Sequence, residues 1–457
     1  MLRSASRTLC LITSILLALI ALPVRSGAQS LPAPTRLIDS DPGLFEAYGL
    51  SASGSGDTLV IGAPGAFPDP LVDVYVRSGT HWNLQAKIIS PDGGASDFFG
   101  DAVAQDGDRL VVGAPDRLSA SGAAYVFLRT GSAWTLEATL RASDPVGNAR
   151  FGDAVAIDGD TLAVGAIGFN QSRGAVYVFT RSGSSWSQQQ RLSLSGGVAN
   201  DRLGLSVALS GEALIAGAPG LDGVAVDQGG AFVWRRSGSN WTLEANLRRS
   251  APAQGDRLGW SVDIDGDVAV AGAPDAEANG PTNSGLVLSW LRSTGAWQGL
   301  SELASPEVSS GAQFGTEVRL SGPRLLVGAP YDTIAGDSLR GSAELFLLDD
   351  GQWLRRQRVL ADGGAREDQF GSALALGGNI AGVTAPGTVI DGQTLAGAAY
   401  AYVSLATSID LSGVPAQAVQ IGSTYATAVT VNAPEGIASG DVLIRDDQGN
   451  SCSATLS

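Results

Sequence analysis

One sequence recurs along this chain, and its third copy reads Phe151-Gly152-Asp153-Ala154-Val155-Ala156-Ile157-Asp158-Gly159-Asp160-Thr161-Leu162-Ala163-Val164-Gly165-Ala166. Every copy opens with an aromatic residue or leucine followed by glycine, and the opening glycines are 51, 52, 52, 55, 56 and 56 residues apart. A period of this size, filled with short apolar runs and turn residues, predicts a propeller or a solenoid. The other six openings are Tyr48-Gly49, Phe99-Gly100, Leu203-Gly204, Leu258-Gly259, Phe314-Gly315 and Phe370-Gly371.

A second motif, Gly-Ala-Pro, closes most copies. Two copies are degenerate, because Gly165-Ala166-Ile167 lacks the proline and Thr384-Ala385-Pro386 lacks the glycine. Proline cannot donate to a strand ladder, so this motif marks the end of a strand. The complete versions are Gly62–Pro64, Gly113–Pro115, Gly217–Pro219, Gly272–Pro274 and Gly328–Pro330.

Each repeat contains the pattern of four short strands. In the third copy, Ala154–Ile157 and Leu162–Val164 flank Asp158-Gly159, and Asp-Gly between apolar runs is a strong hairpin signal. Two further strands are expected over Ala175–Phe179 and Trp186–Leu194. A four-stranded antiparallel meander can bury both faces only against neighbouring copies. We expect the aromatic residue that opens a copy to pack between such neighbours. The sequence therefore predicts an all-β fold, a seven-bladed β-propeller of four-stranded antiparallel blades.

The two ends of the repeat region predict how the ring closes. The seventh copy has a third strand over Ala398–Leu405 but no fourth strand with a tryptophan. Before the first copy, Pro34–Ser40 resembles Gln190–Leu194, which precedes Leu203-Gly204. We expect this N-terminal strand to complete the last blade, because such pairing removes the open edge of the ring.

The first residues have the pattern of a secretory signal peptide. Arg3 and Arg7 precede an apolar run from Leu9 to Leu22, and Ser26-Gly27-Ala28 supplies small residues for cleavage. We expect residues 1–28 to be removed after Ala28 and the protein to be secreted or held at the cell surface. An uncleaved membrane anchor is the alternative, although the run is short for a spanning helix.

The repeat pattern of the sequence ends near residue 406. Residues 406–457 contain neither motif, and alternating runs such as Asp441–Arg445 predict strands. Ser439–Ile444 and Asn450–Ala454 resemble the start of bacterial Ig-like repeats. The segment is about half of an immunoglobulin-like sandwich, so we expect a partial Ig-like β segment. The chain is either a fragment of a longer protein or ends in a small partial sandwich. The predicted organisation is thus signal peptide 1–28, propeller 29–405 and Ig-like segment 406–457.

From Pro32 to Leu405 the repeats resemble FG-GAP repeats, the units of the seven-bladed propeller in the integrin α-subunit head. The resemblance implies a ligand-binding or adhesive scaffold, and in that family several blades carry a calcium loop of the form Asp-x-Asp-x-Asp-Gly. Here the corresponding turns, such as Asp106-Gly107-Asp108 and Asp265-Gly266-Asp267, are too short to wrap a cation that needs six to eight oxygens. The repeats look like the metal-free bacterial form, and we expect no metal and no cofactor.

Composition narrows the classes of function. The formal net charge is −16, and loss of the three arginines in residues 1–28 makes the mature chain more negative still. Such a surface repels nucleic acid and anionic membranes, so we expect neither nucleic-acid binding nor membrane insertion. The single histidine, His81, lies in a hairpin beside Trp82, and no phosphate loop or metalloprotease motif occurs. We predict that the protein is not an enzyme, although a pair of carboxylates with glycosidic chemistry stays open.

The expected strand order assigns the loops to two faces. The first-to-second and third-to-fourth hairpins are short and repetitive and lie on one face. We expect an arginine beside the turn in five copies, namely Arg77, Arg129, Arg181, Arg235 and Arg292. The second-to-third loops are longer, differ between copies and lie on the other face, where recognition usually resides. Acidic residues gather in these long loops, and the alternative is that they are ordinary polar loop residues. The candidate binding residues are Asp69, Asp116, Asp222, Asp227, Asp275, Glu277, Asp332, Asp337 and Asp391.

The sequence favours a secreted or cell-surface, non-catalytic binding or adhesion protein. Its monomeric propeller is expected to present the long loops to a protein or glycan partner. Two alternatives stay open at this point. One is an extracellular hydrolase or lyase that uses the propeller as a scaffold, and the other is an inert structural module of a larger surface protein.

Overall fold

The computed structural model describes residues 31–403, except Ala95 and residues 278–281, and four short strands that follow them. The chain divides into two compact units. One unit comprises Ser30–Val403, and the other comprises Met1–Gln29 with Ser404–Ser457. The predicted signal peptide, residues 1–28, lies outside the described residues.

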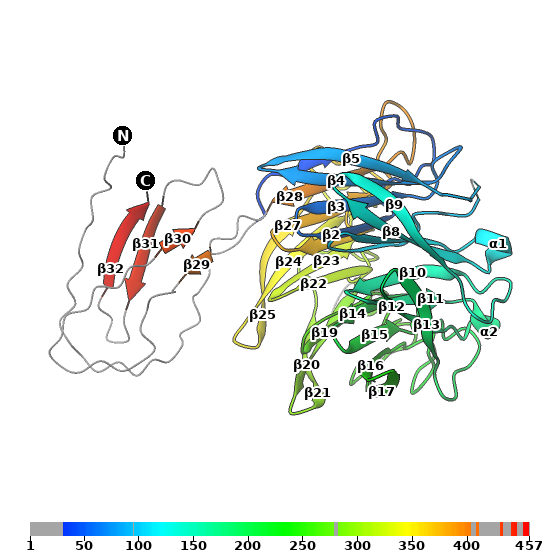
Figure 1. Ribbon diagram of the computed structural model, residues 1–457. Coiled ribbons are helices and arrows are strands. Elements are labelled where there is room, and N and C mark those ends of the chain that lie inside the picture. The colour runs from blue at the N-terminus through cyan, green and yellow to red at the C-terminus, as the bar shows by residue number, and fades with distance from the viewer. Residues whose placement is uncertain are drawn as a thin grey trace. The chain divides into compact units, whose positions relative to one another are not determined.

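The unit of residues 30–403 contains seven four-stranded antiparallel sheets, which confirms the seven-bladed β-propeller (Figure 1). Blade 1 consists of β2 Ser51–Ser55, β3 Thr58–Ala63, β4 Leu71–Ser78 and β5 His81–Ile89. Blade 2 consists of β6 Val103–Asp106, β7 Arg109–Ala114, β8 Ala123–Thr130 and β9 Ala133–Leu140. Blade 3 consists of β10 Phe151–Asp158, β11 Thr161–Ala166, β12 Val176–Ser182 and β13 Ser185–Leu192. Blade 4 consists of β14 Val207–Ser210, β15 Ala213–Gly217, β16 Ala231–Ser237 and β17 Asn240–Leu247.

Blades 5 to 7 continue the same order. Blade 5 consists of β18 Val262–Asp265, β19 Val268–Ala273, β20 Leu286–Ser293 and β21 Ala296–Leu303. Blade 6 consists of β22 Glu317–Ser321, β23 Arg324–Ala329, β24 Ser342–Asp349 and β25 Gln352–Val359. Blade 7 consists of β26 Leu374–Gly377, β27 Ile380–Ala385, β28 Ala398–Val403 and the N-terminal strand β1 Thr35–Leu37. Two four-residue turns, α1 Arg117–Ala120 and α2 Phe169–Ser172, lie in the second-to-third loops of blades 2 and 3.

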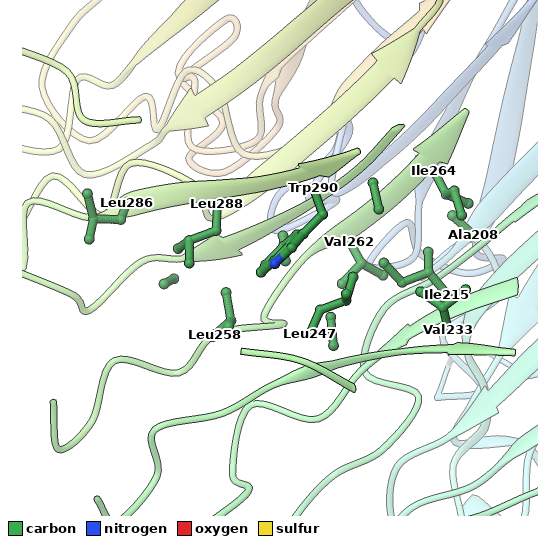
Figure 2. Close-up of a cluster of buried hydrophobic side chains, with 14 of the residues drawn as sticks. Ala208, Ile215, Val233, Leu247, Leu258, Val262, Ile264, Leu286, Leu288 and Trp290 are labelled. Carbon is green, nitrogen blue, oxygen red and sulfur yellow. The ribbon is translucent and has the colours of Figure 1, made fainter. Parts of the chain in front are cut away.

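The hydrophobic core is divided into seven clusters, each shared by two neighbouring blades. Figure 2 shows the cluster between blades 4 and 5, where Ile215 and Val233 of one blade meet Val262 and Trp290 of the next. The aromatic residue of the opening motif belongs to these clusters. Phe151 is fully buried, and its ring lies 5.4 Å from the ring of Tyr177 in an edge-on arrangement. The motif aromatic therefore packs between blades, as its place in the repeat predicted.

The two motif glycines meet at six of the seven junctions between blades, all except the one where Thr384 replaces the closing glycine. The opening glycine has a φ between +88° and +101° in all seven copies, a region that side chains disfavour. Its carbonyl oxygen approaches the closing glycine of the preceding blade. A Cβ atom on Gly113 would lie 2.0 Å from the oxygen of Gly152, and one on Gly217 would lie 1.8 Å from that of Gly259. The glycine of Gly-Ala-Pro is thus required by the approach of the next blade's backbone.

Strand β1 closes the ring by antiparallel pairing with β28, with Thr35 opposite Ala401 and Leu37 opposite Ala399. This confirms the predicted closure by an N-terminal strand. The closing strand has three residues, whereas the fourth strands of the other blades have eight or nine. The degenerate Thr384 lies at this same junction, where its Cβ atom would lie 2.8 Å from a Cβ on Gly49.

Tryptophans at the start of the fourth strands link the outer edges of the blades. The Nε1 of Trp186 donates to Glu137 at 3.1 Å, and that of Trp297 donates to Glu244 at 3.0 Å. Each acceptor lies on the fourth strand of the preceding blade. Trp82 of blade 1 follows the short strand β1, and its buried Nε1 has no hydrogen-bond partner among the described residues. The sequence predicted these tryptophans as strand markers but not as links between blades.

The second unit contains two strand pairs in its described part. β29 Ser408–Asp410 pairs with β30 Thr430–Asn432, and β31 Gly440–Arg445 pairs with β32 Ser451–Leu456, both antiparallel. The Ig-like assignment of residues 406–457 stays a prediction. Within the part of the chain that the structure describes, no helix is both long and apolar enough to cross a bilayer.

Candidate functional site

The propeller has a hairpin face and a long-loop face. The long-loop face is formed by the second-to-third loops together with the segments that lead from one blade to the next. Backbone hydrogen bonds join these two sets of loops, such as Arg150 N to Ala120 O at 2.8 Å and Arg202 N to Ser172 O at 2.9 Å. The residue before the motif aromatic has positive φ in every copy, Arg150 and Arg202 included. The long loops of blades 2 to 7 are therefore tied to the opening of the next blade.

The hairpin face uses its turn residues to connect neighbouring blades. The amide of Gly159 donates to Asp106 Oδ2 at 2.8 Å, and the amide of Gly211 donates to Asp158 Oδ2 at 2.5 Å. Gly322 bonds Asp265 in the same way at 2.6 Å. The first acid of the Asp-Gly turn thus accepts a hydrogen bond from the next turn. In the described residues, no group of three or more His, Cys, Asp or Glu side chains is arranged to hold a metal ion.

The second acid of each turn pairs with an arginine at the end of the third strand. Arg129 Nε lies 2.8 Å from Asp108 Oδ1. In blade 4 the sequence pattern placed Arg235 beside the turn, but the structure places Arg236 there, 2.7 Å from Glu212. Arg235 instead contacts Glu244 at 3.1 Å. The prediction was wrong by one residue because adjacent side chains of a strand point to opposite faces.

Three of the nine predicted loop acids brace the loops themselves. Asp332 is fully buried and accepts hydrogen bonds from Ser342 Oγ at 2.7 Å and from Arg358. Asp116 accepts from Arg150 at 2.5 Å. Asp275 pairs with Arg257 at 2.9 Å and accepts from Gln313 at 2.6 Å. These carboxylates hold neighbouring segments together on the long-loop face.

The remaining six acids project from the loops of five blades. Asp69, Asp222, Glu277 and Asp391 are exposed. The other two, Asp227 and Asp337, are partly exposed. Within blade 4, Asp222 accepts a hydrogen bond from the amide of Asp227 at 2.9 Å. Because the loops belong to separate blades, the structure distributes these acids over the long-loop face and does not gather them into one site.

A cavity of about 240 Å³ lies where the first strands of the blades converge. We call it the axial pocket. Its walls are the residues that follow the motif glycine, and that glycine bonds to the end of the second strand, as in Gly100 N to Gly113 O at 3.0 Å. The second-to-third loop leaves from this end, so the pocket lies toward the long-loop face. Residues from all seven blades line it, among them Leu50, Asp101, Asp153, Leu205, Trp260, Thr316 and Ser372.

One wall of the axial pocket carries two carboxylates beside an arginine. Arg150 Nε donates to Asp153 Oδ1 at 2.8 Å, and Arg150 Nη2 lies 3.9 Å from Asp101 Oδ2. Burial raises the pKa of Asp101 to about 7, and the Asp153 carboxylate adds to the rise while Arg150 opposes it. Burial also raises the pKa of Asp153, against the effect of Arg150. Two adjacent carboxyl groups therefore share one cation in a confined space.

Another wall combines an ion pair with an aromatic side chain. Arg319 Nη1 lies 2.5 Å from Glu317 Oε1, and burial raises the pKa of Glu317 although Arg319 lowers it. Trp260 lines the pocket beside this pair, and the guanidinium carbon of Arg257 lies 5.9 Å from the centre of its ring. The axial pocket therefore offers carboxylates, a guanidinium, hydroxyls and an aromatic surface within one cavity.

The sequence alone did not predict the axial pocket, because the repeated first strand was interpreted as a structural element without a binding role. A signal was nevertheless present. The position after the motif glycine carries Leu, Asp, Asp, Leu, Trp, Thr and Ser in the seven copies, while the glycine itself does not change. A variable residue inside a repeated motif indicates a position whose side chain is free to differ between blades.

Two comparisons with known proteins bear on this architecture. A family model described as FG-GAP repeat matches residues 82–127, 134–179, 186–234, 241–287 and 353–402, which together make up more than half of the chain. Each match begins at the tryptophan of one fourth strand and ends in the third strand of the next blade. Human integrin alpha-D is 29% identical over 158 residues, which are 30% of this chain and 13% of that relative.

Proposed function

Because this chain belongs to the FG-GAP repeat family, we propose that it is a secreted or cell-surface, non-catalytic binding protein. Its propeller presents the long-loop face to a protein or glycan partner. The observation that carries the proposal is the contrast between the two faces. The hairpin face repeats one set of contacts from blade to blade, whereas the long-loop face differs at each blade.

Side chains without internal contacts support the choice of face. Phe67, Phe45 and Val389 are 83%, 58% and 54% exposed, and all three lie in long loops or blade-to-blade segments. In the long loop of blade 4, on the same face, Val224 is 92% exposed. Exposed apolar side chains next to charged ones are typical of interaction surfaces. The hairpin-face carboxylates, by contrast, are engaged by arginines or by the next turn.

Export and partner class rest on different observations. Secretion rests on the sequence pattern of residues 1–28, and surface location is in keeping with the integrin relative. The long loops show both acids and apolar residues, which suit a protein or a glycan better than an anionic polymer. A single closed ring, with its edge strand paired, is consistent with a monomer.

A charge-reversal experiment tests the face. We expect the triple variant Asp69→Lys, Asp222→Lys, Glu277→Lys to weaken binding of the partner at least tenfold, because three exposed carboxylates on the long-loop face become cations. The control is Asp57→Lys, Asp108→Lys, Asp160→Lys on the hairpin face, whose carboxylates are 57%, 62% and 62% exposed. Partners come from arrays of extracellular proteins and glycans, and affinities are then measured by biolayer interferometry.

The control variant loses three surface ion pairs, each worth about 0–1 kcal/mol, and should keep its affinity within threefold. Equal loss of affinity in both variants would contradict the choice of face. If neither array yields a saturable partner, the binding function itself is wrong, and the alternative of an inert structural module gains support.

One observation favours a second candidate, an extracellular hydrolase. Asp101 and Asp153 line one pocket, and the raised pKa of Asp101 suits the general acid that hydrolysis of a glycoside needs beside a second carboxyl group. We expect the binding function to prevail, with no turnover of aryl glycosides or polysaccharides. Turnover that falls at least a hundredfold in Asp153→Asn, with the thermal midpoint unchanged, would establish the enzyme instead.

A further inference from the structure

We propose that the axial pocket binds one residue of a neutral sugar. This inference rests on the binding function proposed above and identifies the ligand class of its central site. It is drawn from the size of the cavity, an unsatisfied carboxylate, the mixture of polar groups and the aromatic side chain.

The volume limits the ligand to a single ring. At about 240 Å³ the pocket is smaller than the roughly 300–1,000 Å³ typical of pockets for larger organic ligands. Its walls come from all seven blades, from the first strands or the residues directly before them, so they belong to the framework of the ring. A longer glycan would therefore place one terminal residue in the pocket and extend the rest across the long loops.

Asp101 is a carboxylate that needs a donor. Its side chain is 19% exposed, and the closest cation atom, Arg150 Nη2, is 3.9 Å away, which is beyond hydrogen-bond distance. No donor among the described residues bonds to it. A partly buried carboxyl group without a protein partner favours a ligand hydroxyl, which can donate to the carboxylate and accept from the protonated acid.

The other polar groups complement hydroxyls in both directions. Asp153 and Glu317 accept, Arg319 donates, and the hydroxyls of Thr316 and Ser372 can do either. A sugar ring carries several hydroxyl groups, each of which both donates and accepts. The alternation of acceptors and donors around the cavity matches that ligand better than it matches a purely anionic or purely apolar molecule.

Charge and the aromatic side chain narrow the class further. Three carboxyl groups and one guanidinium line the pocket directly, so it offers fewer partners to sulfated sugars and uronic acids than to neutral sugars. Trp260, Leu50 and Leu205 supply apolar surface for the C–H groups of the ring. A basic side chain of a partner protein could also pair with the carboxyl groups of the pocket. Two of these groups, however, already pair with Arg150 and Arg319 of the propeller itself.

The test titrates the full chain with methyl glycosides of glucose, galactose, mannose and N-acetylglucosamine, by calorimetry and saturation-transfer NMR. We expect saturable binding of at least one of them. Asp101→Asn and Trp260→Ala should each weaken it at least tenfold. Asp101→Asn keeps the shape of the side chain and removes no internal hydrogen bond. Asp160→Asn, an exposed residue of the hairpin face, is the matched control and should bind as the wild type does.

The possible outcomes distinguish a failure of the sugar-binding inference from a failure of the proposed binding function. Sugar binding that survives in both pocket variants overturns the inference. So does the absence of sugar binding while a partner found on the arrays still binds the long-loop face, which leaves the proposed function intact. Pocket binding of N-acetyl-arginine amide instead of the glycosides would assign the cavity to a basic side chain and also overturn it. Failure of both sugars and array partners would refute both proposals.

Discussion

Gly113→Ala is expected to destabilise the propeller by roughly 3 kcal/mol or more, the upper end of the cost of overpacking a core. The new Cβ atom would lie 2.0 Å from the carbonyl oxygen of Gly152 on the next blade. The oxygen is a backbone atom, and the position of the Cβ atom is fixed by the backbone of residue 113. Neither atom can rotate away, so the two blades must separate. Urea unfolding followed by tryptophan fluorescence measures the loss.

Gly159→Ala is the matched control for this prediction. Gly159 lies in a hairpin turn with a φ of +56°, and no atom lies within 4 Å of an added Cβ. Its replacement should cost about 1 kcal/mol, the price of a left-handed conformation alone. If Gly113→Ala and Gly159→Ala lose similar amounts of unfolding free energy, the close contact between blades is not the reason that glycine is needed at position 113.

The propeller is also expected to become more stable as the pH falls from 8 to 5. Burial raises the pKa of Asp73 and of Asp101 to about 7 and that of Asp263 to about 6. In the unfolded chain these groups titrate near 4. Between those values the folded state binds more protons, so the free energy of unfolding falls as the pH rises through 6 to 7. The combined effect is on the order of several kcal/mol.

The trend reverses in strong acid. Carboxylates whose pKa is lowered lose their stabilising contribution when they are protonated, so the greatest stability should lie near pH 4 to 5. Hydrogen bonds and ion pairs with Tyr125, Arg109 and Arg236 contribute to these lowered values. The groups concerned are Asp92, Glu137, Glu212, Glu244 and Glu307.

Asp73→Asn identifies the source of the pH dependence. Asp73 is fully buried and faces Lys87, Asp39, Tyr75 and Tyr48, and its Oδ1 has no hydrogen-bond partner among the described residues. The variant should be more stable than the wild type at pH 8 and closer to it at pH 5, as measured by thermal unfolding across this range. The exposed control Asp57→Asn should leave the profile unchanged. A flat wild-type profile from pH 5 to 8 would contradict the prediction.

Local signals in the sequence were sufficient for the architecture. Asp158-Gly159 predicted a hairpin, and the structure pairs Asp158 with Thr161 across it. The motif aromatic, Phe151, predicted an apolar contact between blades, and the resemblance of Pro34–Ser40 to a fourth strand predicted the closure. These features succeed because each depends on a few neighbouring residues and recurs in several copies.

The axial pocket depended on information that a single strand does not carry. Asp101 and Asp153 are 52 residues apart in the sequence, and Glu317 is further still. They share a cavity because the ring brings the start of every first strand to one axis. The same limit explains why Trp186 could be placed on a strand but not matched with Glu137.

The short closing strand has a mechanical consequence. Thr35 begins β1 opposite Ala401, close to Val403 at the end of β28. The chain therefore enters and leaves the ring at the same end of one strand pair. Tension between these two points bypasses six blades and peels three residue pairs apart in succession rather than shearing them together. Under load the ring opens at this seam first, and it does so at low force.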